Sequence, residues 1–144
     1  MAVRKEYKIN PIDLKKNVAV GVKLPMGGRG IFQSSYTTEE QAISNLKNLI
    51  LTRKGERPFQ PVFGSDVYSL LFEQMTGFLE ESLKSSIKQD VNFWLPYILL
   101  DDVIVNTLDD FNRVNISLKF RVTQSGANQT IIIYADEQGG LSAN

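Results

Sequence analysis

The sequence predicts an α+β domain in which three helices pack on one face of a C-terminal three-stranded antiparallel meander, with an irregular N-terminal arm. Apolar residues recur at helical spacing up to Trp94, and apolar–polar alternation takes over after Pro96. Helices followed by strands in this order are typical of two-layer α+β folds. The expected divisions are an arm at 1–36, the α+β domain at 37–136 and a polar tail at 137–144.

The first helix is predicted from Thr38 to Lys54. Thr37 and Glu40 fit a capping box, in which each side chain binds an otherwise unpaired backbone N–H group. Gly55 follows, and glycine readily takes the left-handed conformation that ends many helices.

Two more helices are predicted before Pro96, which cannot continue a helix. The second opens at Ser65, whose hydroxyl can cap the first turn. Its apolar face comprises Tyr68, Leu71, Phe72 and Met75. The third begins at Thr76 or Gly77, and its apolar positions are Leu79, Leu83, Ile87, Val91 and Trp94.

Three strands follow. The first places Val103 and Val105 on one face, and the second alternates apolar and polar residues from 113 to 122. A loop at 124–128 leads to the third strand, where apolar residues point to both faces; these are Ile131, Ile132 and Ile133. If the meander order holds, this strand is an exposed apolar edge that the arm covers or that a partner extends by strand addition.

The composition restricts the chemistry that the chain can perform. The chain has 144 residues, 42% hydrophobic and 22% charged, as expected for one soluble globular domain without a membrane segment or signal peptide. Histidine and cysteine are absent, which excludes disulfides, Ser-His-Asp triads and His or Cys zinc sites. We therefore expect no cofactor, no metal and no enzyme activity.

Carboxylate clusters do not change this expectation. Glu73, Glu80 and Glu81 could be taken for a glycosidase pair, but neighbouring Glu80 and Glu81 point apart on a helix and suit its first turn. The aspartates after Pro96 lack the spacing of a calcium loop, and 109–112 suits a turn between strands.

Charge is unevenly placed although the net charge is zero. Residues 1–30 hold seven basic side chains against Glu6 and Asp13, while the remaining chain is acidic. The arm is therefore either a solvated tail or a segment that docks on an acidic partner. Nucleic acid is not expected, because no basic stripe with interleaved aromatic residues follows.

The connector between the first two helices, Thr52–Gly64, has the unusual sequence TRKGERPFQPVFG. Its cations could grip a phosphate, or cap the helix and form ion pairs. Arginines and aromatic residues are also enriched at protein-binding hot spots. The connector candidates for partner binding are Arg53, Arg57, Phe59 and Phe63.

This connector resembles the T-R-K-G-E-R-P…P-x-F-G signature of small baseplate wedge proteins of contractile-tailed phages. That family has members in type VI secretion baseplates and has been labelled lysozyme-like. The resemblance extends over most of the chain, from Val18 through the later strands. It implies a structural subunit of the virion tail baseplate, in a sixfold arrangement, that is assembled in the host cytoplasm.

The resemblance also implies partners. The protein would bind the core bundle of larger wedge proteins, and its sheet would template the first ring of the tail sheath protein by strand addition. A type VI secretion subunit and a peptidoglycan-cleaving enzyme are the alternatives. Many members carry Glu-Pro-Arg after the third helix, where this chain has Leu95-Pro96-Tyr97. A salt-bridged contact is therefore not expected there, whereas an apolar contact through Leu95 and Tyr97 is.

Overall fold

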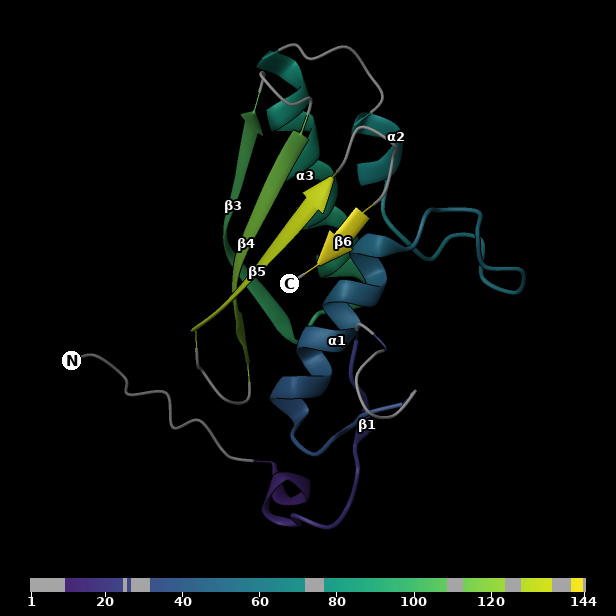
Figure 1. Cartoon of the computed structure of the whole chain (residues 1–144), viewed down its shortest axis with the longest axis vertical. Coiled ribbons are helices and arrows are strands. Elements are labelled where there is room, and N and C mark those ends of the chain that lie inside the picture. The colour runs from purple at the N-terminus through teal and green to yellow at the C-terminus, as the bar shows by residue number, and fades with distance from the viewer. Residues whose placement is uncertain are drawn as a thin grey trace, which may run out of the picture.

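The computed structural model of the chain describes residues 10–24, 26, 32–71, 77–108, 113–123, 128–135 and 141–143. Its helical elements are the 3-10 helix η1 (Pro11–Leu14), α1 (Thr38–Leu51), α2 (Val67–Leu71) and α3 (Gly77–Trp94). Its strands are β1 (Gly21–Val22), β2 (Ser34–Ser35), β3 (Ile98–Leu108), β4 (Arg113–Val122), β5 (Asn128–Ala135) and β6 (Leu141–Ala143). Figure 1 shows their arrangement.

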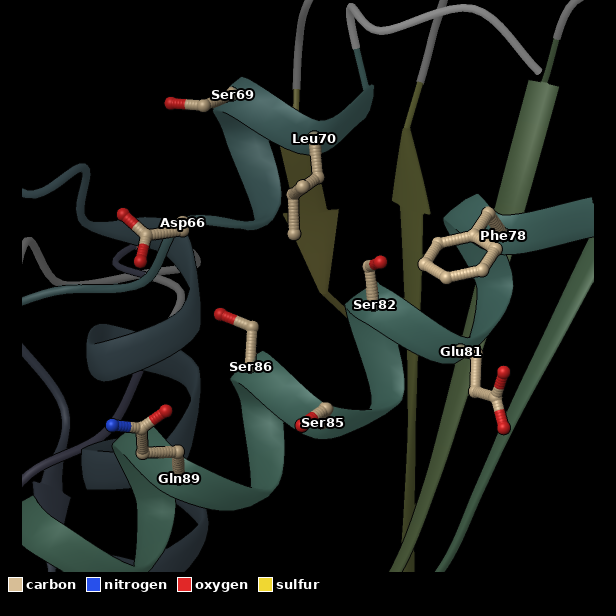
Figure 2. Close-up of a pocket in the computed structure, with 9 residues that line it drawn as sticks. All are labelled: Asp66, Ser69, Leu70, Phe78, Glu81, Ser82, Ser85, Ser86 and Gln89. Carbon is tan, nitrogen blue, oxygen red and sulfur yellow. The ribbon is translucent and has the colours of Figure 1, made fainter. Parts of the chain in front are cut away.

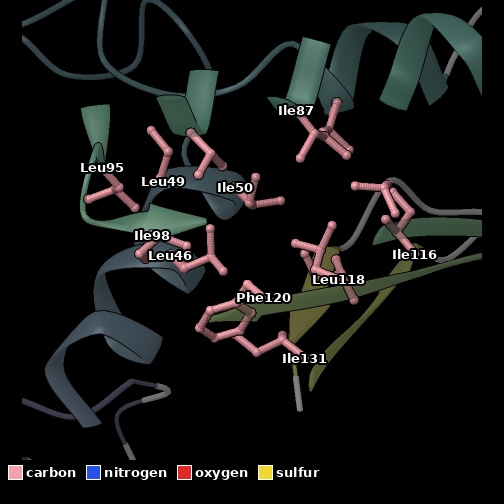
Figure 3. Packing of buried hydrophobic residues seen from close by; sticks show 14 of the residues in the cluster. Leu46, Leu49, Ile50, Ile87, Leu95, Ile98, Ile116, Leu118, Phe120 and Ile131 are labelled. Atoms are coloured by element: carbon pink, nitrogen blue, oxygen red, sulfur yellow. The ribbon is translucent and has the colours of Figure 1, made fainter. Parts of the chain in front are cut away.

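The main sheet is antiparallel, with strand order β3-β4-β5-β6. Alternation in β4 decides which face is covered, because every second residue from Val114 to Val122 is buried. These residues join α1 and α3 side chains in one core, where Leu46, Leu49 and Ile87 of the helices face the strands (Figure 3). The predicted α+β class, with helices against one face of an antiparallel sheet, is confirmed.

A bulge in β3 keeps the apolar face of that strand continuous. The register shifts between Leu100 and Asp102. Ile98 and Val103 are an odd number of residues apart and would lie on opposite faces of a regular strand, but because of the bulge both point into the core. The extra residue, Asp101, lies on the other side and accepts two hydrogen bonds from Arg121, 2.8 Å from Nε and 2.6 Å from Nη2. The pair holds β3 to β4 next to the bulge.

Helix α1 begins as predicted but ends three residues early. Thr37 Oγ1 accepts the Glu40 N–H at 3.2 Å, as a capping box requires. At the other end, Thr52 is extended and its Oγ1 donates to the Asn48 carbonyl at 2.6 Å. A threonine hydroxyl competes for helical carbonyls in this way, so the predicted end at Lys54 was wrong and Gly55 is not the cap.

Ser65 does not cap the second helix. Its Oγ donates instead to the Ile50 carbonyl at 2.8 Å, deep in the structure, and it is Asp66 whose carbonyl accepts the Leu70 N–H. The hydroxyl thus satisfies an unpaired carbonyl near the end of α1. Phe72 and Met75 of the predicted apolar face lie outside the described residues. The third helix, by contrast, spans 77–94 as expected.

The sheet extends one strand further than the meander predicted. Within the expected polar tail, Leu141–Ala143 forms β6 and pairs with Ile133–Ala135. The third predicted strand is therefore not wholly an edge, since its second half is paired on both sides. Over Asn128–Ile132, β5 pairs with β4 but with no other strand among the residues that the structure describes.

Two leucines of β3 and β4 test the assignment of the sheet faces. Leu118 is fully buried in the core, whereas Leu99 is about half exposed on the opposite face. We expect Leu118→Ala to lower the free energy of unfolding by roughly 2–5 kcal/mol, because it leaves a cavity, and Leu99→Ala to cost much less. Urea unfolding of both variants measures this, and equal losses would mean that the faces are assigned wrongly.

Candidate partner-binding surface

The connector Thr52–Gly64 projects from the helical layer as an exposed loop of defined shape (Figure 1). Backbone hydrogen bonds close it internally. The Gly55 N–H donates to the Pro61 carbonyl at 2.7 Å, and the Phe63 N–H donates to the Gln60 carbonyl at 3.0 Å. At its tip, Phe59 is fully exposed. The loop thus presents an aromatic side chain on an internally bonded backbone.

Two glycines let the backbone turn. Gly64 has φ 126°, and a Cβ there would lie 2.6 Å from the Thr52 carbonyl oxygen, so both conformation and space require glycine. Gly55 has φ 92°, but a Cβ there would meet nothing within 4 Å. The base of the loop is therefore much more tightly constrained than its outer part.

An ion-pair cluster fixes the base of the connector to the helices. Lys54 Nζ lies 2.5 Å from Asp66 Oδ2 and 2.8 Å from Asp90 Oδ1. Asp90 belongs to α3 and is buried. Burial disfavours the charged amine, but the hydrogen bonds and charges of Asp66 and Asp90 outweigh this effect and raise the pKa of Lys54. The connector therefore holds the counter-ion of a buried carboxylate.

Arginines and aromatic rings continue from the connector to the end of α3. The Arg57 guanidinium carbon lies 4.1 Å from the ring centroid of Phe63, and Phe63 packs edge-on against Trp94 at 5.2 Å. Trp94 in turn contacts Phe93 at 5.1 Å. Edge-on aromatic pairs and cation–π contacts each stabilise by about 0.5–1.5 kcal/mol.

The three predicted connector cations do not converge on one point. Lys54 is held by two carboxylates, Arg57 lies over Phe63, and Arg53 lies 3.4 Å from the Tyr68 ring centroid. This arrangement agrees with the ion-pair and protein-binding interpretations better than with a phosphate grip.

The run after α3 serves the core more than we expected. Leu95 is buried and offers a partner little surface, so the contact predicted through it stays a prediction. Tyr97 is half-buried, and its hydroxyl accepts a hydrogen bond from Asn45 Nδ2 of α1 at 2.8 Å. Pro96 is exposed, and so is Phe93. From the sequence, the aromatic cluster of Phe93, Trp94 and Tyr97 could close the core or anchor a partner, and Phe93 was not among the predicted site residues. Phe93 precedes Trp94 outside the 3.6-residue apolar stripe, and this position is the signal that could have identified it.

The isoleucines of β5 divide between the two faces. Ile131 and Ile133 belong to the core, whereas Ile132 is partly exposed on the outer face. Near the start of the strand, the Gln129 amide donates to the Glu39 carboxylate at the beginning of α1. Helix α1 therefore lies close to the half of β5 that has no second strand partner.

Glu80 and Glu81, the described members of the carboxylate cluster, lie in different surroundings. Glu80 binds Lys84 at 2.7 Å, one turn along α3. Glu81 lines an open groove of about 610 Å³ between α2 and α3, with Asp66 at the opposite end and Phe78 and four serines around it (Figure 2). Glu73 lies outside the described residues. Among those described, no three acidic side chains could hold a metal ion, and no helix is long and apolar enough to cross a bilayer.

Three solved structures share this fold at 15–20% identity. A Geobacter sulfurreducens protein, provisionally named as a tail lysozyme, aligns with TM-score 0.63 and 19% identity over 71% of this chain and 93% of its own. A chain of the sixfold-symmetrised anti-feeding prophage baseplate aligns with TM-score 0.61 and 20% identity, over 70% of this chain and 82% of its own. A chain of the type VI secretion baseplate complex aligns with TM-score 0.52 and 15% identity, over 65% of this chain and 90% of its own. These identities show the fold alone, and it is a fold found in baseplate assemblies.

Sequence comparison identifies the family. The model of the family described as Baseplate wedge protein gp25 matches residues 37–127, well over half of the chain. The protein therefore belongs to the gp25 family of baseplate wedge proteins, and the predicted resemblance is confirmed. It is 35% identical over 82 residues to baseplate wedge protein gp25 of Enterobacteria phage T4. That match covers 55% of this chain and spans 60% of the relative's length.

Gly64 and Gly55 form a matched pair for testing the constraint at the loop base. Gly64→Ala should lower the free energy of unfolding by about 1–3 kcal/mol or more. The backbone strain of a positive φ adds to the steric clash between the new Cβ and the Thr52 carbonyl. Gly55→Ala carries strain without the contact and should cost less. Chemical denaturation compares them, and a larger loss for Gly55→Ala would contradict the described geometry.

Lys54 tests the ion-pair cluster. Lys54→Met leaves the buried Asp90 carboxylate without its cation, and we expect a loss of about 1–3 kcal/mol in the free energy of unfolding. Because the pKa of Lys54 is raised, its contribution is fully present below the ordinary pKa of 10.5 and is lost as pH rises through the folded value. The deficit should therefore be constant across neutral pH and shrink above 10.5.

Lys84→Met, which breaks an exposed pair on α3, is the control and should have little effect. Denaturant titrations at several pH values separate the two variants. A Lys54→Met protein as stable as wild type near neutral pH would show that the connector is not held through Asp90.

Proposed function

We propose that this protein is a structural subunit of the baseplate wedge of a contractile phage tail and catalyses no reaction. The observation that carries the proposal is the connector, an exposed loop whose backbone is bonded internally and whose base is tied to a buried carboxylate. Membership of a family named for baseplate wedge proteins supports the same conclusion.

In this proposal, the connector and the end of α3 together bind the wedge core. Arg57 and Phe59 supply the residue types that dominate hot spots, and Phe63 supports Arg57 from below. Pro96 and Phe93 extend the surface at the end of α3. Because the loop is already ordered, little conformational entropy would be lost on binding, which favours affinity.

The sheet supplies the second proposed contact. The Asn128–Ile132 half of β5 can accept an added strand from the tail sheath protein, since main-chain hydrogen bonds give affinity and alternating side chains give register. Six copies would then template the first sheath ring. The location would be the tail baseplate of the virion, after assembly in the host cytoplasm. Unchanged sheath binding by Ile132→Pro, in a protein shown to be folded, would count against this contact.

Two alternatives remain to be distinguished by experiment. A type VI secretion baseplate subunit would share the fold, and the genes that neighbour this one would separate it from a phage protein. A peptidoglycan-cleaving enzyme would release reducing sugars from purified peptidoglycan, and Glu73→Gln would abolish the release. We expect no release from the wild-type protein.

Incorporation into tail particles tests the structural role. Quantitative mass spectrometry of purified intact particles should find this protein in a small fixed ratio to the sheath protein, equivalent to about one ring. Phe59→Ser should lower incorporation severalfold without changing thermal stability, because the ring is exposed and touches no core residue.

Phe78→Ser is the matched control, since Phe78 is also exposed but lies on α3 away from the connector. Its incorporation should equal that of wild type. Absence of the wild-type protein from particles would overturn the structural role, and equal incorporation of all three proteins would overturn the role of the connector.

A further inference from the structure

The N-terminal arm is held on the domain without contributing to its core. The described hydrophobic core begins at Ala42, so no arm residue belongs to it. Polar contacts attach the arm to α1 instead. Asp13 Oδ1 accepts the Thr38 N–H at 2.8 Å, Lys23 pairs with Glu40 at 2.8 Å, and Ser44 Oγ accepts the Leu24 N–H at 3.3 Å. The arm is thus positioned by hydrogen bonds and charge.

A charged contact and a pair of short strands hold the arm against α1. The Lys23 hydrogen bond, with the Tyr36 N–H, lowers the pKa of the Glu40 carboxyl. Strands β1 and β2 pair as a short ladder, with Val22 opposite Ser34, and both strands lie against α1. The ladder itself is therefore held against α1.

The apolar side chains of the arm point outward. Seven of the thirteen large hydrophobic side chains that are exposed in the described structure lie between residues 12 and 36. Leu14 is 71% exposed and Phe32 is 69% exposed. The other five are Ile12, Val18, Val22, Met26 and Tyr36. Single exposed apolar residues are ordinary, whereas many of them in one short segment are a reason to look for a protein-binding surface there.

Charge indicates the kind of partner. The arm's described acidic residue, Asp13, is occupied by Thr38, and Lys23 is occupied by Glu40. Lys15 and Lys16 lie between Leu14 and Val18, are exposed, and have no carboxylate within 4.0 Å in the described part of the chain. Apolar side chains interleaved with unpaired cations are complementary to an apolar face bordered by carboxylates.

We propose that the described arm residues, 12–24, 26 and 32–36, contribute to a second docking surface, which binds another protein of the particle at an apolar patch bordered by aspartate or glutamate. The proposal rests on the structural role proposed above. Nucleic acid would account for Lys15 and Lys16 but would leave Leu14 and Phe32 exposed to water. A protein partner accounts for all four side chains.

Site-specific crosslinking within particles tests this surface. Photoreactive p-benzoylphenylalanine in place of Phe32, in the full chain, should crosslink to a particle protein at a segment that carries apolar residues beside Asp or Glu. The same group in place of Phe59 reports on the connector, and in place of Phe78 it is the control. Lys15→Glu combined with Lys16→Glu should lower the yield at position 32 severalfold, without changing the melting temperature.

The outcomes separate this inference from the structural role. Crosslinks from position 59 without any from position 32 would overturn the arm surface alone. Crosslinks from position 32 to nucleic acid, or only within the same chain, would also overturn it. Absence of the protein from particles would overturn both proposals together.

Discussion

The shape of the connector depends on how its two ends are fixed to buried atoms. On one side, Lys54 neutralises Asp90, a carboxylate that burial would otherwise make costly. On the other, Ser65 donates a hydrogen bond to the Ile50 carbonyl, and Gly64 lies so close to the Thr52 backbone that no side chain fits between them. Because both ends are tied, the residues between them can be exposed and still hold one conformation.

The one-sided sheet has a related effect on the rest of the surface. Alternation in β4 directs every apolar residue of that strand to the helices. The bulge at Asp101 keeps Ile98 and Val103 of β3 on the same face of the sheet. Helix α1 therefore serves two purposes. One side of it supplies Leu46 and Leu49 to the core, and its polar residues hold the arm. The residues that fill the core and the residues that we propose to bind partners are thus largely separate.

Much of the fold could be predicted because its signals are local. The alternation of β4 and the capping pair of Thr37 and Glu40 each depend on neighbours a few residues apart, and both are confirmed. The end of α1 could not be predicted, because Lys54 pairs with Asp90, which is distant in the sequence, and because the Thr52 hydroxyl bonds the Asn48 carbonyl where the helix ends.

The candidate site was predictable to a lesser degree. Composition identified Arg57 and Phe59 because exposed arginine and aromatic residues in a connector are unusual, and the structure places both on the surface. Composition could not show that Leu95 is buried, because its burial depends on tertiary packing: Leu95 joins Ile98 and the apolar residues of α1 and α3 in one core. Short β6 was missed because three residues in a polar segment carry no alternation signal.

A high-resolution electron cryomicroscopy map of the intact tail particle would test whether the connector is a preformed protein-binding loop. We expect Arg57 and Phe59 to be buried against another baseplate chain, with the loop backbone unchanged from that of the isolated protein. A connector that faces solvent in the assembled particle, or one refolded into a different shape, would contradict it.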